Sequence, residues 1–73
     1  MKYAVEQRLR FLEFLVAHYD SVGREHLVDF FGISAPQATR DFKLYKSIAP
    51  DNLLFDDVAK KYKRSHQFKR VYK

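Results

Sequence analysis

Residues 32–45, GISAPQATRDFKLY, contain the pattern that decides the fold of this chain. Gly32 can adopt the left-handed backbone that ends one helix before the next begins. Ser34 is a candidate N-cap for that next helix, and Gln37, three residues later, would complete a capping box. Pro36 suits the first helical turn, where its missing N–H costs nothing. The stretch therefore predicts a tight turn followed by a helix.

A second short amphipathic helix is predicted just before this turn, from Arg24 to Phe31, with Leu27, Phe30 and Phe31 as its core contacts. Two short helices joined by a short turn that contains glycine form a helix-turn-helix. This geometry places the second helix in the major groove of DNA. The functional question therefore concerns mainly the helix that follows Ser34.

The composition describes one small domain, residues 1–73, that lacks the groups from which most metal or redox sites are built. The chain has no cysteine, and its three histidines, His18, His26 and His66, are widely spaced, so we expect no metal and no other cofactor. We find no nucleophile–base pair and no glycine-rich phosphate loop, so we do not expect an enzyme. The sequence also shows no signal peptide and no long apolar run, which predicts a cytoplasmic protein without a membrane partner.

Positive charge is concentrated in the second half of the chain. The net charge is +5, but residues 1–39 contain four basic and five acidic residues, whereas residues 40–73 contain ten basic and four acidic residues. This asymmetry predicts an anionic partner for the C-terminal half. A solvated basic tail would give the same count. Because the charge coincides with the helix-turn-helix and the residues after it, nucleic acid is favoured.

The first helix is predicted at about residues 4–19, and its apolar arc is wide. One stripe at helical spacing consists of Val5, Leu9, Leu12, Val16 and Tyr19. Phe11 and Phe14 widen the arc beyond half of the helix circumference, which a small monomer cannot easily cover. Two interpretations stay open. Either a later segment such as the C-terminal tail packs on this helix, or Phe11 and Phe14 form the contact of a homodimer.

The recognition helix is predicted at about residues 35–47, and it ends before Pro50. Its inward stripe would consist of Ala38, Phe42 and Tyr45. This stripe leaves the opposite side of the helix free to face a partner.

A small β-hairpin, called the wing below, is predicted after this helix at about residues 52–64. Its two strands would be residues 52–56 and 61–64, and Val22 could pair with them as a strand of one or two residues. The basic tail, residues 65–73, could be a final strand, a docking segment or a linker. The expected fold class is therefore mainly α with a small β-hairpin: a winged helix-turn-helix of three helices plus a wing.

The outward side of the recognition helix has side chains that suit a major groove. Arg40 can donate two hydrogen bonds to O6 and N7 of guanine, Gln37 can pair bidentately with adenine, and Thr39 can contact thymine. The other DNA-binding candidates on this helix are Ser34 and Pro36 at its start, and Lys43 and Lys46 further along, where phosphate contact fits better. Taken singly, each could be an ordinary surface residue, but together they favour DNA contact.

Asp41 differs from its neighbours on this helix. We expect it to pair with a basic group or a neighbouring helix rather than to read a base, because a carboxylate is a poor match for an anionic partner.

The wing carries a cluster of cations, Lys60, Lys61, Lys63 and Arg64. These side chains could bind phosphates or reach into the minor groove. Lysines also protect an edge strand against aggregation, and both roles can hold at once. Tyr62, between them, is expected in the core rather than as a stacking platform.

The segment FGISAPQATRDFKLY at residues 31–45, followed by APDNL at residues 49–53 and by Lys61-Tyr62, resembles the winged helix-turn-helix that opens bacterial WYL-domain transcription regulators. It is similar, more loosely, to DeoR-type repressors. The resemblance covers nearly the whole chain. It implies a bacterial or phage-encoded, nucleoid-associated regulator that binds an inverted repeat near a promoter as a homodimer.

Members of that family usually continue into a WYL domain that senses a ligand. The resemblance therefore leaves two expectations: an excised domain, or a small regulator that stands alone. No small-molecule ligand is indicated within these residues.

Residues and resemblance together predict sequence-specific binding of double-stranded DNA by a transcriptional regulator, a repressor rather than an activator. The alternative is a winged helix that binds another protein and has only weak, non-specific affinity for nucleic acid. Binding of RNA or single strands usually needs exposed aromatic platforms, and most aromatic residues here have core spacing.

Overall fold

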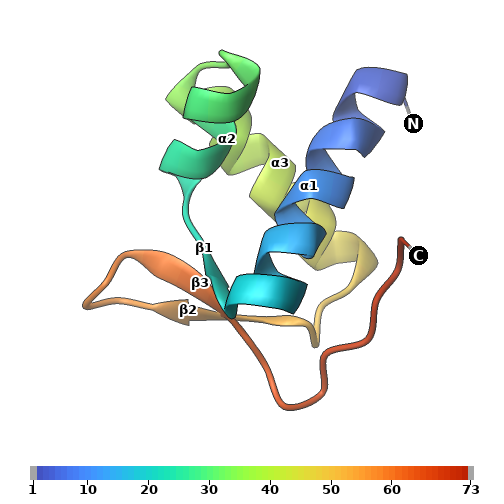
Figure 1. Cartoon of the computed structure of the whole chain (residues 1–73), viewed down its shortest axis with the longest axis vertical. Helices are drawn as coiled ribbons and strands as arrows, with labels where there is room; N and C mark the ends of the chain where they lie inside the picture. Colours follow the sequence, from blue (N-terminus) through green and yellow to red (C-terminus); the bar gives the residue numbers. More distant parts are fainter. Residues whose placement is uncertain (1, 73) are drawn as a thin grey trace.

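Three helices and a three-stranded sheet form the protein in the computed structural model, which describes residues 2–72 (Figure 1). The elements are α1 (Tyr3–Tyr19), β1 (Ser21–Val22), α2 (Arg24–Phe31), α3 (Ala35–Ile48), β2 (Leu53–Asp56) and β3 (Lys61–Arg64). The expected fold class, three helices plus a wing, is confirmed. Met1 and Lys73, the ends of the predicted domain and of its basic tail, lie outside the described residues.

The helices α2 and α3 form the predicted helix-turn-helix. Gly32 ends α2 at φ 69°, in the left-handed conformation predicted for it. Ser34 caps α3, since its Oγ accepts a hydrogen bond from the Gln37 N–H at 3.2 Å. The second half of the predicted capping box is wrong: the Gln37 side chain bonds to Asp41 and Arg40 instead. A charged partner on the same helix thus outcompetes the N-cap amide.

The sheet is antiparallel throughout, with β3 in the centre between β1 and β2. The predicted pairing of Val22 with the hairpin is confirmed, because Val22 lies opposite Tyr62. Asp56 stabilises the wing turn: its Oδ1 accepts hydrogen bonds from the N–H groups of Ala59 and Val58. The bond from Ala59, followed by the interaction with Lys63 and the bond from Val58, holds the pKa of Asp56 below its ordinary value.

The core lies where the three helices meet the sheet. It contains Leu9, Leu12, Val16, Val22, Leu27, Ala38, Phe42, Tyr45, Ala49 and Leu53. The prediction that Tyr19 and Phe30 lie in the core is wrong, since these side chains are 68% and 66% exposed. Tyr19 is the last residue of α1, and the left-handed Asp20 turns the chain away after it. Phe30 lies at the rim of α2 and stacks on Phe11 instead of entering the core.

The tail is a docking segment rather than a strand or a linker. After β3 it turns back toward α1, and its end lies near that helix in Figure 1. Phe68 and Tyr72 pack against the core. The N–H groups of Val71 and Tyr72 donate hydrogen bonds to the carboxylate of Glu13, each at 2.8 Å. The tail therefore covers part of the wide apolar arc of α1.

None of the helices within residues 2–72 is long and apolar enough to cross a membrane.

Candidate nucleic-acid interface

The outward side of α3 is open to solvent. Pro36, Thr39, Arg40, Lys43 and Lys46 are all exposed, and Gln37 is half-buried on the shoulder of the helix. The apolar residues that hold α3 in place, Ala38, Phe42 and Tyr45, lie on the opposite side and are buried. The predicted division of this helix into an inward and an outward side is therefore observed.

A chain of hydrogen bonds runs from α1 to the outward side of α3. Arg8 donates to Asp41 from Nε at 2.5 Å and from Nη2 at 3.2 Å. Gln37 Nε2 donates to Asp41 Oδ1 at 2.9 Å, and Arg40 Nη2 donates to Gln37 Oε1 at 3.0 Å. Asp41 is buried and Arg8 nearly so. The predicted structural role of Asp41, pairing with a neighbouring helix, is thus observed.

This chain of bonds fixes the orientation of the Gln37 amide. A carboxylate can only accept hydrogen bonds, so the NH₂ group of Gln37 must face Asp41 and its oxygen must face Arg40. Bidentate pairing with adenine needs both groups free. The predicted adenine contact of Gln37 would require the bond to Asp41 to break. The geometry suits a different task, which is to hold the guanidinium of Arg40.

Thr39 is held by a residue that the sequence did not single out. Its hydroxyl donates to the carbonyl oxygen of Ala35 at 3.2 Å and accepts from Arg24 Nη1 at 3.1 Å. Arg24 is the first residue of α2 and is exposed. Its guanidinium thus adds positive charge beside the outward side of α3. The sequence signal that could have identified Arg24 was its position as a basic residue at the start of the first helix of the helix-turn-helix.

The wing cations do not form a single cluster. Lys61 pairs with Glu25 at 3.6 Å, and Lys63 pairs with Asp56 at 3.0 Å. Arg64 pairs with Asp20 at 2.5 Å and donates to the carbonyl oxygen of Ala17 at 2.8 Å.

Arg64 therefore attaches the base of the wing to the end of α1, away from the wing turn. Lys60, in the turn at φ 58°, forms no ion pair with the other described residues. Of the four predicted phosphate-binding cations, it is the one whose charge is not matched by a neighbouring carboxylate.

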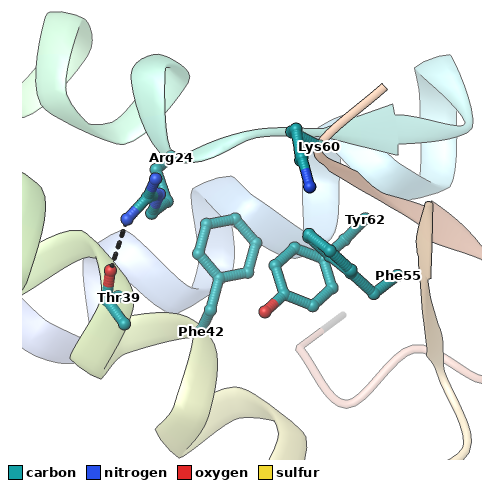
Figure 2. A pocket seen from close by; sticks show the side chains of 6 residues that line it. All are labelled: Arg24, Thr39, Phe42, Phe55, Lys60 and Tyr62. Carbon is teal, nitrogen blue, oxygen red and sulfur yellow. Dashed lines mark hydrogen bonds between the residues drawn. The ribbon is translucent and has the colours of Figure 1, made fainter. Parts of the chain in front are cut away.

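A cleft of about 470 Å³ lies between α3 and the wing (Figure 2). It is lined by Arg24, Thr39, Phe42, Phe55, Lys60 and Tyr62. Tyr62 stacks on Phe42 with ring centroids 4.5 Å apart and contacts Phe55 at 5.0 Å. Tyr62 is half-buried, so it packs on the core, as predicted, and also forms part of the cleft wall. Lys46 Nζ lies 5.6 Å from the centroid of the Tyr62 ring.

The two aromatic residues proposed as a dimer contact lie in different surroundings. Phe11 is half-buried, stacked on Phe30 at 4.3 Å and edge-on to Phe31 at 5.4 Å. Phe14 is 43% exposed and rests against His18 at 4.5 Å. Part of the predicted contact surface is therefore satisfied within the chain, and Phe14 is the member that remains available.

A buried polar cluster between α1, α3 and the tail was missed by sequence reasoning. Glu13 is fully buried, and its Oε2 accepts a hydrogen bond from the Tyr45 hydroxyl at 2.6 Å. Asn52 donates to the same hydroxyl at 2.9 Å. Burial, and next the bond to Glu13, raise the pKa of Tyr45 far above its ordinary value. The available signal was a carboxylate placed inside the apolar arc of the first helix.

A helix-turn-helix followed by a wing, with cations and amide groups on the open side of the second helix, defines a winged helix-turn-helix domain of the DNA-binding class.

Comparison with known families agrees with this class. The sequence profile of the BrxR transcriptional regulator winged helix-turn-helix domain matches residues 4–73, and the chain belongs to this family. The resemblance to bacterial transcription regulators drawn from the sequence is thereby confirmed.

Three curated relatives are each named DNA-binding transcriptional repressor CapW. The chain is 38% identical to the protein of Escherichia coli strain KTE188 and 37% identical to that of Pseudomonas aeruginosa, in both cases over 97% of its length. It is 34% identical to the protein of Stenotrophomonas maltophilia over its full length. The chain spans 24% of the length of each of these relatives.

Proposed function

We propose that this chain is the DNA-reading part of a transcriptional repressor. In this proposal α3 enters the major groove of double-stranded DNA and the wing lies along the adjacent backbone. The observation that carries the proposal is the open side of α3, where Arg40 is held in place by a chain of hydrogen bonds that begins on α1. The relatives named DNA-binding transcriptional repressors, which align with almost the whole chain, support it.

The proposed contacts divide by chemistry. Arg40 is the base reader, through O6 and N7 of guanine, and Thr39 lies beside it on the same side of the helix. Lys43 and Lys46 lie further along α3, where they would meet phosphates, as would the Ala35 N–H at the helix start, beside Ser34 and Pro36. In the wing, Lys60 is the leading phosphate contact. Lys61, Lys63 and Arg64 would have to leave their carboxylate partners to add to it.

We further infer a homodimer that binds two half-sites about one helical turn apart, at about 34–36 Å. A two-fold operator would follow from the symmetry of such a dimer. A repressor of this kind acts on the bacterial chromosome, so we place its action in the cytoplasm, at the nucleoid.

Fluorescence anisotropy provides the first test. The chain is titrated against a duplex from the region upstream of its own gene and against a shuffled duplex of the same composition, each at two salt concentrations. A preference for the native duplex that persists at the higher salt supports a sequence-specific regulator, because non-specific binding is mostly electrostatic. No binding to either duplex at low salt would reject DNA binding and favour the protein-interaction alternative.

A further inference from the structure

The charges around the cleft between α3 and the wing are unbalanced. Neither Arg24 nor Lys60 forms an ion pair with another described residue, and the six residues that line the cleft include no carboxylate. The next three cations of the wing, Lys61, Lys63 and Arg64, all have carboxylate partners. Two like charges beside one cavity give it a positive potential. The lining of the cleft therefore favours a negative group.

The walls of the cleft also carry apolar surface. Figure 2 shows Arg24 bonded to Thr39 beside the ring of Phe42, and Lys60 above the aromatic rings with its amino group directed toward them. The ring of Tyr62 and the half-exposed ring of Phe55 line the same space. Phosphate alone would leave the exposed surface of these rings uncovered. A ligand with an anionic group and an apolar, ring-shaped body matches the whole lining, and a sugar phosphate has both.

The position of the cleft points to the source of that ligand. When α3 occupies the major groove and the wing lies on the adjacent backbone, one DNA strand must cross the space between them. Resting on the function proposed above, we propose that this cleft seats one sugar–phosphate unit of the DNA backbone. Arg24 and Lys60 bind the phosphate, the hydroxyl of Thr39 holds the guanidinium of Arg24, and Phe55 and Tyr62 contact the deoxyribose.

Neutral variants of the two cations test the proposal through the salt dependence of binding. Each phosphate contact contributes about 0.9 to the slope of log K against log salt for B-form DNA. Both cations bind the same phosphate, so the Arg24→Gln/Lys60→Gln variant should reduce the steepness of that slope by about 0.9, and each single variant by less. Glutamine retains a side chain at both positions, including the left-handed Lys60. Circular dichroism and thermal melting confirm that each variant is folded.

Arg10→Gln is the matched control. Arg10 carries the same charge, but it lies on α1 against the ring of Tyr72 and pairs with Glu6, outside the cleft. Its loss should leave the slope unchanged. If all three single variants lower the slope equally, total charge explains the effect and the proposal is wrong.

A second experiment locates the phosphate. Each phosphate of a bound duplex is replaced in turn by an uncharged methylphosphonate. At one position, the replacement should weaken DNA binding by the wild-type protein about tenfold but should not change binding by the Arg24→Gln/Lys60→Gln protein. If no position shows this loss of sensitivity, the cleft does not seat the backbone.

A free nucleotide shares the chemistry of the backbone, so a further arm separates the two sources. Thymidine 5′-monophosphate is added to the protein without DNA, at constant ionic strength, and amide shifts are followed by NMR. Backbone seating predicts no saturable shift at the cleft below millimolar nucleotide. Micromolar binding would assign the cleft to a free nucleotide instead. Failure of the wild-type protein to bind any duplex is a separate result, since it removes the proposed function as well.

Discussion

At the scale of single residues, the side chains that orient Arg40, the proposed base reader, come from two helices, α3 and α1. Arg40 is exposed, but its guanidinium is oriented by Gln37, which in turn is held by the buried pair of Asp41 and Arg8. Hydrogen bonds in which one partner is charged are about twice as strong as neutral ones. If Arg40 reads a base as proposed, its flexible side chain is ordered before DNA arrives, which lowers the entropy that binding must offset.

Replacement of Arg40 by alanine should weaken specific binding by about 1–3 kcal/mol and relax the preference at one base pair, because a bidentate contact to guanine is lost. Gln37→Ala should relax the preference at the same base pair, since Gln37 acts through Arg40. The measurement is competition with every single-base variant of the bound duplex. Equal losses on all duplexes for Arg40→Ala would exclude base reading, and loss of an adenine preference elsewhere in Gln37→Ala would show that Gln37 reads DNA directly.

Asp41→Ala should lower the free energy of unfolding by about 3 kcal/mol, because it leaves the nearly buried guanidinium of Arg8 without its partner. The double variant Arg8→Met/Asp41→Ala removes both charges and should recover part of that loss. Urea denaturation of the three proteins measures the differences. A double variant less stable than Asp41→Ala would mean that the pair contributes mainly through packing of Arg8.

At the scale of elements, the tail and α3 are connected through one buried carboxylate on α1. Glu13 accepts hydrogen bonds from the Tyr45 hydroxyl and from the N–H groups of Val71 and Tyr72, with Arg70 Nε 3.7 Å away. A fully buried charge is costly unless it is paired and hydrogen-bonded, as it is here. Separation of the tail from α1 would leave Glu13 underbonded. This fold therefore includes the tail rather than ending at the wing.

The raised pKa of Tyr45 predicts a loss of stability at alkaline pH. In the unfolded chain this phenol ionises near its ordinary value of 10.0, whereas in the folded protein burial and Glu13 keep it neutral to higher pH. Its contribution is fully present below pH 10. Above that value the unfolded state binds fewer protons than the folded state, so stability falls by up to about 1.4 kcal/mol per pH unit.

Tyr45→Phe has no phenol at this position and should lose less stability over the same range. Urea denaturation between pH 8 and pH 11 compares the two proteins, and Tyr72, whose pKa burial also raises, is common to both. The stability difference between wild type and Tyr45→Phe should shrink as the pH rises above 10. Parallel curves would show that Tyr45 ionises alike in both states.

Local patterns were enough to predict the elements of the fold, while contacts between distant elements were not. Gly32, Ser34 and the inward stripe of α3 follow from backbone preference and helical spacing, which neighbouring residues determine. The hydrogen bonds of Glu13 reach residues 58 and 59 positions later, and no local pattern encodes them. The pairing of Arg64 with Asp20 likewise depends on where β3 meets the end of α1. Arg64 and Lys60 belong to the same run of cations in the sequence. That run alone could not show that Arg64 pairs with a carboxylate and that Lys60, among the described residues, does not.

At the scale of the whole molecule, the DNA-facing and the aromatic surfaces involve different elements. The candidate DNA contacts lie on α3 and the wing, with Arg24 at the start of α2. The exposed aromatic residues Phe14 and Phe30 lie on α1 and the end of α2, where they border a second hollow of about 350 Å³. Exposed apolar patches of this kind often mark contacts between proteins. In the dimer proposed above, two copies could associate through this surface without covering the candidate DNA contacts of either.

A homodimer through this surface predicts self-association that depends on Phe14. In a two-fold interface the same patch meets itself, so a single substitution acts twice. Sedimentation equilibrium at high micromolar concentration should give twice the monomer mass for the wild type and the monomer mass for Phe14→Ser.

Val58→Ser is the matched control, since Val58 is apolar and 95% exposed but lies in the wing turn, so its loss should leave the dimer intact. The monomeric variant should also bind an inverted repeat no more tightly than a single half-site, because linking two half-sites is what a dimer adds. A wild type that remains monomeric at these concentrations would reject this interface. The proposed DNA binding would then involve one α3 at a single half-site, without two-fold symmetry.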